Sequence, residues 1–176
     1  HGGLLSRGAR LCRRSRGRRC LPQRCRALPR GRDPGVTPND LQTYLHQRIP
    51  LSRAMAVEVR SATAEGVELF APLAPNINHR DTVFGGSASA VAILAAWCAL
   101  YVRMRAEQRA GRIVIRRNRM SYERPITGDF IARSAPPDAA AWARAVATLG
   151  KGRPARVHVT TTLECSGQAV GVLEGE

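Results

Sequence analysis

The run from Ala88 to Val102 is almost wholly apolar, and it constrains the fold more than any other segment of the chain. From Gly86 to about Arg109 the pattern is helical, but the apolar residues cover every side of that helix rather than one stripe. A helix without a polar face must be enclosed on all sides. A membrane span is the alternative, but this apolar core is shorter than the roughly 20 residues that a span needs. We therefore expect a helix buried inside a curved sheet, with no membrane partner.

Shorter segments with helix or strand character lie on both sides of this run. Thr37 or Asn39 caps a short helix over 40–48, which Pro50 stops, and strands over 54–60 and 67–72 flank a turn at 64–66. Four more strands are predicted over 113–122, 130–134, 156–165 and 168–173, with a short helix or surface loop over 137–149. The order predicts an α+β fold in which a long central helix is wrapped by a curved antiparallel sheet.

Residues 1–36 differ from the rest in charge. They hold 11 arginines and one aspartate, so most of the net charge of +15 lies there and residues 37–176 are only mildly basic. Such a segment cannot bury enough apolar area to offset its ordering entropy, and we interpret it as an Arg-rich disordered tail or a spurious N-terminal extension. No aromatic residues interleave the arginines, so we expect no specific nucleic-acid binding. The domain is expected over 37–176, with its last strand truncated at Glu176.

The cysteines do not form a disulfide framework. Cys12, Cys20 and Cys25 lie in the tail and lack zinc-ligand spacing, while Cys98 falls in the apolar helix as a small buried residue. The Arg-rich start is not followed by an apolar run of signal length. We therefore expect a cytoplasmic, reducing setting, and no metal or other cofactor.

The loop that enters the long helix carries the candidate chemistry. Gly85 and Gly86 allow a tight backbone path, and the first amides of a helix lack intrahelical partners and carry the positive end of its dipole. These amides can stabilise an oxyanion, such as the one that forms when a thioester is hydrolysed. Ser87 could cap the helix or contact the substrate.

Two polar residues precede this turn. Asn78 could orient the attacking water or hold the thioester oxygen, and His79 could act as general base near neutral pH. The alternatives are that Asn78 bonds nearby backbone and that His79 is structural or solvated.

Several segments resemble the hot-dog-fold putative thioesterase family, whose domain also occurs at the C-terminus of some bacterial acetyltransferase-like proteins. The segments that carry the resemblance are 41–46, 49–55, 71–79, 82–87 and 121–129. The resemblance covers roughly residues 38–176. It implies a homodimer with two helices side by side under a continuous sheet. It also implies acyl-CoA or acyl-carrier-protein substrates, bound at the dimer interface, and a role in fatty acid metabolism.

The chain departs from the broader hot-dog thioesterases in two ways. Phe84 replaces the His of their His-Gly-Gly turn, and the helix offers no carboxylate between Val91 and Ala96, where many of those enzymes carry Asp or Glu. His79, or a carboxylate from elsewhere or from the partner subunit, would have to be the general base. Asn78, His79 and Gly86 are therefore the predicted catalytic residues.

Further residues are candidates for substrate binding. Phe84, Gly85 and Ser87 adjoin the predicted oxyanion site. Arg117 and Arg119, with Arg116, could meet CoA phosphates or could form a charged, solvated strand edge. Trp97 fits the core or a dimer contact better than an acyl pocket.

The leading function is hydrolysis of acyl thioesters. A hydratase or dehydratase is a second possibility, but Ala74 stands where the hydratase loop has its Asp. A non-catalytic acyl-thioester binding module is the third. It would bind acyl-CoA without releasing thiol.

Overall fold

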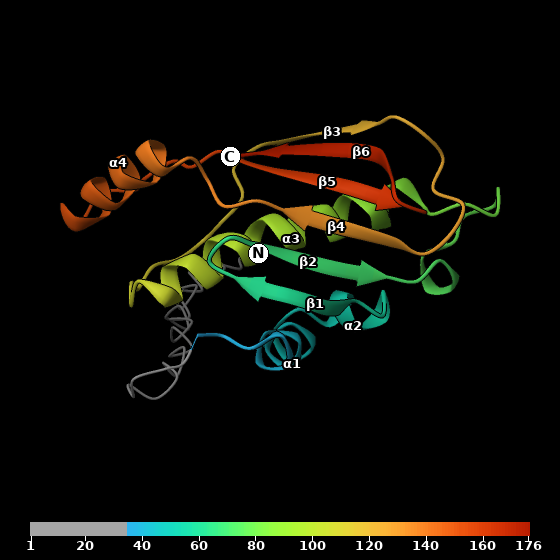
Figure 1. Ribbon diagram of the computed structural model, residues 1–176, viewed down its shortest axis with the longest axis horizontal. Helices are drawn as coiled ribbons and strands as arrows, with labels where there is room; N and C mark the ends of the chain where they lie inside the picture. The colour runs from blue at the N-terminus through green and yellow to red at the C-terminus, as the bar shows by residue number, and fades with distance from the viewer. Residues whose placement is uncertain (1–34) are drawn as a thin grey trace, which may run out of the picture. The chain divides into compact units, whose positions relative to one another are not determined.

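Helix α3 (Gly85–Ala106) lies along one face of a six-stranded antiparallel sheet that curves around it (Figure 1). The computed structural model describes residues 35–176, and all but the last two residues of the predicted Arg-rich tail (1–36) lie outside the described residues. Apolar side chains of α3 and of the inner sheet face form the core. The α+β prediction of a central helix wrapped by an antiparallel sheet is confirmed.

The sheet has the strand order β1-β2-β4-β5-β6-β3, so β1 and β3 are its edges. The bounds of the strands are β1 (Glu58–Thr63), β2 (Gly66–Ala71), β3 (Asn118–Tyr122), β4 (Phe130–Ser134), β5 (Val159–Cys165) and β6 (Gln168–Gly175). Every neighbouring pair is antiparallel. β3 therefore pairs with β6 on one side and leaves its outer backbone groups without a strand partner among the described residues.

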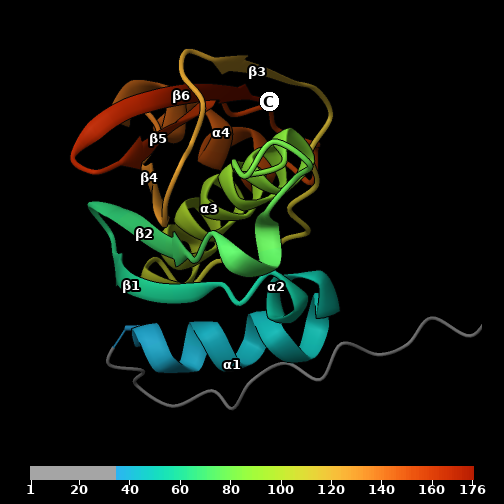
Figure 2. The same cartoon turned by 90° about the vertical axis from the view of Figure 1, so that its right-hand side faces the viewer.

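Two short helices precede the sheet and lie beside β1 (Figure 2). Helix α1 (Pro38–Arg48) is capped by the Thr37 hydroxyl, which accepts from the Asp40 amide at 3.2 Å, and it buries Leu41 and Leu45 completely. Pro50 ends α1 but also starts a second helix, α2 (Pro50–Ala54). The predicted strand over 54–60 is therefore wrong at its start, because proline suits a first helical turn.

The membrane-span alternative for α3 has a basis in the length and hydropathy of this helix. With 22 residues, α3 is long and apolar enough to cross a membrane by length and composition, and half of its most apolar window is buried inside the protein. The described chain by itself leaves one face of α3 open. Ala90, Ile93, Trp97 and Leu100 form a partly exposed stripe there, at helical spacing.

The segment before β3 does not follow the prediction of one strand over 113–122. Strand β3 begins at Asn118, and Ile113 instead accepts a hydrogen bond from Trp97 Nε1 of α3 at 3.4 Å. Val114 and Ile115 are 69% and 46% exposed. Residues 113–115 therefore lie along the open stripe of α3, whereas Arg116 and Arg117 still bond Glu176 through the backbone at the end of β6.

Helix α4 (Ala139–Gly150) is inserted between β4 and β5 and extends beyond the end of the sheet (Figure 1). Asp138 caps it, so the helical alternative for 137–149 is confirmed. The indole of Trp142 donates to Glu107 at 2.6 Å and fastens α4 to the end of α3. Strand β5 starts at Val159 rather than at residue 156, and β6 runs to Gly175, two residues past the prediction.

Candidate functional site

A small hairpin leads into α3. Ile77 and Val83 form an isolated antiparallel bridge, and the Asn78 amide donates to the Thr82 carbonyl at 2.8 Å. Asp81 closes the tip with a positive φ of 56°. The hairpin therefore has a defined shape, which fixes where Phe84 and the two glycines begin the helix.

The side chain of Asn78 holds this hairpin together. Its Nδ2 donates to the Thr82 hydroxyl at 3.0 Å and to the Val83 carbonyl at 3.2 Å. Its Oδ1 accepts from the Arg80 amide at 2.7 Å and from the amide and hydroxyl of Thr82 at 3.4 and 3.3 Å. Both donors and both acceptor lone pairs are occupied. In this geometry Asn78 bonds nearby backbone, which is the second of the two roles that the sequence left open.

His79 lies at the exposed tip of the hairpin. Within residues 35–176 its ring has no recorded hydrogen-bond partner. Without such a partner the imidazole of His79 can rotate, and no neighbouring group of the described chain fixes its tautomer or its orientation. The structure thus places His79 in the same loop as the glycines without preorganising it.

The first three amides of α3 are free donors. The amides on either side are used, because Val83 donates to the Ile126 carbonyl at 2.8 Å, Phe84 to Asn76 at 2.7 Å and Ala88 to Phe84 at 3.0 Å. Phe84 is the N-cap residue and offers no side-chain cap. Gly85, Gly86 and Ser87 therefore keep unpartnered N–H groups in the described chain, as expected of a first helical turn. Ser87 does not cap the helix, which leaves its hydroxyl without a recorded partner there.

Phe84 lies beside these amides on the open side of the protein. Its side chain is 57% exposed, and its ring packs so closely over Gly86 that a Cβ at position 86 would overlap it. Glycine at 86 therefore lets an aromatic ring border the free amides.

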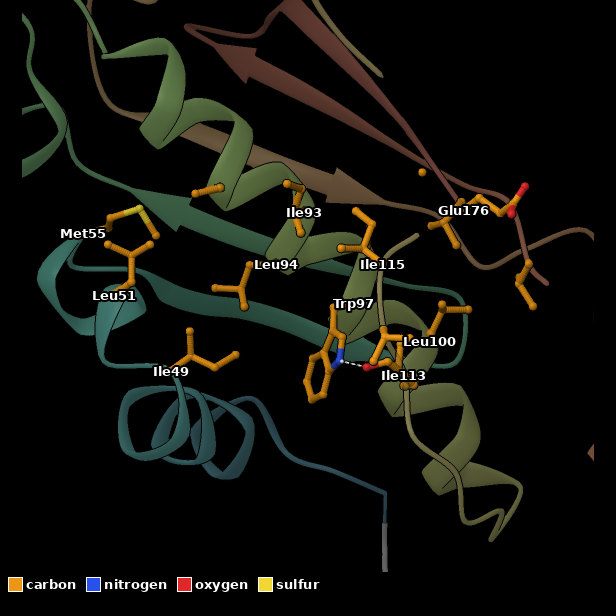
Figure 3. A pocket seen from close by; sticks show the side chains of 16 residues that line it. Ile49, Leu51, Met55, Ile93, Leu94, Trp97, Leu100, Ile113, Ile115 and Glu176 are labelled. Carbon is orange, nitrogen blue, oxygen red and sulfur yellow. Dashed lines mark hydrogen bonds between the residues drawn. The ribbon is translucent and has the colours of Figure 1, made fainter. Parts of the chain in front are cut away.

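A cavity of about 320 Å³ begins one helical turn beyond Gly86 (Figure 3). Gly86 lies on the same face of α3 as Ala90, Ile93 and Trp97, because these residues follow at intervals of three and four. Leu94, Ala96 and Leu100 of α3 also line it. The rest of the lining comes from α2 and its two flanking residues, from residues 113–115, from the start of β5 and from the end of β6: Ile49, Leu51, Met55, Ile113, Val114, Ile115, Val157, Val159, Gly175 and Glu176. Trp97 lines this cavity and also packs against the core, where its ring stacks on Tyr44 and Tyr101.

The predicted phosphate-binding arginines lie away from the hairpin. Arg117 and Arg116 pair with the Glu176 carboxylate at 3.2 and 2.7 Å, at the end of the cavity lining near the last strand. These two guanidinium groups lower the pKa of Glu176 to about 2. Arg119 is exposed on β3, one residue from the inward-packing Met120, so it belongs to the outer face of the sheet edge. The structure does not bring Arg117 or Arg119 to the helix start.

Two residues at the site were missed by the sequence analysis. The Tyr122 hydroxyl donates to the Gly85 carbonyl at 2.8 Å, and the buried Asn76 accepts the Phe84 amide through its own carbonyl. The Asn76 side chain donates to the carbonyls of Met55 and Pro72 at 3.0 and 2.8 Å. The Tyr122–Gly85 contact joins residues far apart in the sequence, and the Asn76–Phe84 contact lies in an irregular loop. No local sequence pattern predicts either contact.

Two groups bear on other kinds of chemistry. Burial raises the pKa of the Cys98 thiol, as expected of a small core residue rather than a nucleophile. Within residues 35–176, no three His, Cys, Asp or Glu side chains lie together in a way that could hold a metal ion.

Comparisons with known proteins identify the group to which this site is related. The family profile described as "Putative thioesterase (yiiD_Cterm)" matches residues 38–176. Among solved structures, the putative thioesterase from Shewanella oneidensis is 29% identical, with a TM-score of 0.71 over 78% of this chain and 93% of that one. A Chlorobaculum tepidum protein of unknown function is 25% identical, with a TM-score of 0.75 over 81% and 96%. A Haemophilus influenzae thioesterase is 13% identical, with a TM-score of 0.62 over 79% and 87%, and shares the fold.

Proposed function

The chain belongs to the putative thioesterase family with the hot-dog fold, and from this premise we propose that it hydrolyses acyl thioesters of CoA or of an acyl-carrier protein. The observation that carries the proposal is the set of free amides of Gly85, Gly86 and Ser87 at the start of α3. Gly86 lies on the helix face along which an apolar cavity begins one turn further on. The thioester carbonyl oxygen would accept from these amides, and the acyl chain would extend along α3. One preorganised donor of this kind contributes about 10²–10³ to kcat.

The length of the cavity indicates the size of the acyl chain. Trp97 lies eleven positions after Gly86, which corresponds to about 16 Å along a helix. An extended chain advances about 1.2 Å per bond, so a chain of roughly 12 to 14 carbons reaches from the amides to the Trp97 indole. The indole lies along this path and donates to the Ile113 carbonyl, and the cavity lining continues one turn further, to Leu100. We infer a preference for medium to long acyl chains.

A second copy of this chain would complete the site. The open stripe of α3, the exposed Val114 and Ile115 and the unpaired outer edge of β3 lie next to one another. An unpaired edge strand is a template for pairing, and a twofold axis can place an antiparallel strand against its own copy. In such a homodimer the partner covers the apolar cavity and excludes water from it.

The attacking water requires a base, which the amides do not supply. Helix α3 has no Asp or Glu between Val91 and Ala96. His79 is the titratable group on the entry hairpin whose ring is free to turn, so we propose it as general base, with Asn78 holding the hairpin that carries it. A carboxylate from the partner subunit is the alternative.

The proposal is tested by thiol release from a panel of acyl-CoA and acyl-carrier-protein thioesters of increasing chain length, using the full chain. We expect turnover with a maximum at medium to long chains. His79→Ala is expected to lower kcat, with His158→Ala as a control for loss of an exposed histidine outside the hairpin. Saturable acyl-CoA binding without any thiol release would instead identify a non-catalytic binding module.

A further inference from the structure

Tyr122 links the edge strand β3 to the start of α3. It is the last residue of β3, and its hydroxyl donates to the Gly85 carbonyl at 2.8 Å across 37 positions of sequence. The ring also lies 3.4 Å from the point where a Cβ of Gly85 would stand. Tyr122 is 54% exposed, so packing in the core does not account for this hydrogen bond.

The bonded carbonyl belongs to the same peptide unit as a proposed oxyanion donor. The Gly85 C=O and the Gly86 N–H are the two ends of one planar, conjugated amide. Within α3 the Gly85 carbonyl also accepts from the amide four residues on, and its second lone pair takes the Tyr122 hydroxyl. Donation to the oxygen draws electron density from the nitrogen, so the Gly86 N–H becomes a stronger donor.

The same bond fixes the direction of that N–H. Glycine at both 85 and 86 leaves this peptide unit with more conformational freedom than other residues would allow. The capping residue Phe84 makes no side-chain hydrogen bond to the helix start. The hydrogen bond from the Tyr122 hydroxyl therefore holds the Gly85–Gly86 peptide in place. An N–H donor that is already held in place does not need to reorganise during the reaction.

The position of Tyr122 excludes direct contact with the acyl chain. Gly86 shares its helix face with Ala90, Ile93 and the cavity, whereas Gly85 and Ala88 line a separate hollow with Tyr122 on the other side of α3. The hydroxyl can reach the reaction only through the peptide.

We propose that Tyr122 is a positioning residue for thioester hydrolysis, which orients and polarises the Gly85–Gly86 peptide so that the Gly86 amide binds the oxyanion. This inference rests on the proposed function. A gain of 10–30% in the strength of a donor that contributes 10²–10³ corresponds to about two- to eight-fold in kcat.

Tyr122→Phe removes the hydroxyl and keeps the ring. We expect kcat to fall about two- to eight-fold with KM unchanged. The carbonyl stretch of a bound ¹³C-labelled acyl-CoA ketone analogue should move to higher wavenumber, because its oxygen is less polarised. Tyr44→Phe is the matched control, since the Tyr44 hydroxyl has no recorded partner in the described chain and its ring stacking is retained.

A double-mutant cycle separates this role from simple support of the fold. Gly86→Pro removes the N–H that Tyr122 is proposed to polarise, so Tyr122→Phe should cause no further loss of kcat in that background. Incorporation of 3-fluorotyrosine at 122, which keeps the ring and strengthens the donor, should maintain or raise kcat. Additive losses, a change in KM alone, or an active wild type with unchanged Tyr122→Phe kinetics would overturn the inference. A wild type that is inactive on the whole panel would overturn the proposed function instead.

Discussion

Proline at position 86 removes one proposed oxyanion donor while leaving the helix intact. Gly86 is the second residue of α3, and its amide has no intrahelical acceptor, so the substitution breaks no helix hydrogen bond. Proline disfavours a helical conformation in the residue before it mainly through a clash with that residue's Cβ and amide. The residue before it is Gly85, which has no Cβ.

The expected effect follows from the loss of one of three free amides. Removing a single oxyanion donor lowers kcat by about 10²–10³, equivalent to about 2.7–4 kcal/mol of transition-state stabilisation. KM should change little, because the oxyanion forms in the transition state rather than in the bound substrate. Gly86→Ala is the matched control, since its Cβ meets the Phe84 ring in the same way but its N–H remains.

The assay is steady-state thiol release by Gly86→Pro and Gly86→Ala on the best substrate of the panel, with thermal unfolding of both variants. The Cβ contact with Phe84 is common to the two, and proline alone replaces the N–H by its ring Cδ, so their kcat ratio reports that replacement. A ratio close to one between two equally stable variants would refute the assignment of the Gly86 amide to the oxyanion.

Three further outcomes are expected. Trp97→Ala enlarges the cavity, so the substrate with the highest kcat/KM should become longer, whereas Trp97→Phe should shift it less. An unchanged chain-length profile would place the acyl chain elsewhere. Val114→Asp puts a charge on the proposed dimer face and should yield a folded monomer in sedimentation velocity, while Ala143→Asp on the exposed face of α4 should leave the assembly unchanged. Arg116 and Arg117 lower the pKa of Glu176 from 4.5 to about 2. The stability difference between wild type and Glu176→Gln should therefore be fully present above pH 4.5 and should be lost as the pH falls toward 2. Thermal unfolding across that pH range measures this difference.

Much of the fold could be predicted from hydrophobic periodicity. The apolar run in α3 and the alternation in β2 and β4 each identify their element, because burial on one face imposes a period on the sequence. The predictions are wrong where packing between distant segments determines the secondary structure. Residues 113–115 have strand composition but lie along α3, and the uniformly apolar α3 has one face that the described chain does not cover.

The sequence predicted only those parts of the candidate site that depend on local patterns. Gly85 and Gly86 mark a helix start by local rules, so their free amides could be expected from the sequence. Asn78 could be placed in the loop, but its role depends on which hydrogen bonds it makes, and the structure shows them all within the hairpin. Tyr122 could not be found, because its bond to Gly85 depends on how β3 is placed against α3.

The location of a bound thioester carbonyl tests the central claim most directly. A structure of the full chain with an acyl-CoA analogue, in which a methylene group replaces the thioester sulfur, would show the ketone oxygen and the acyl chain together. We predict that the oxygen lies about 2.7–3.1 Å from an amide of Gly85, Gly86 or Ser87, with the chain directed along Ala90 and Ile93 toward Trp97. A ketone oxygen bound away from these amides, or an acyl chain outside the cavity, would contradict the account.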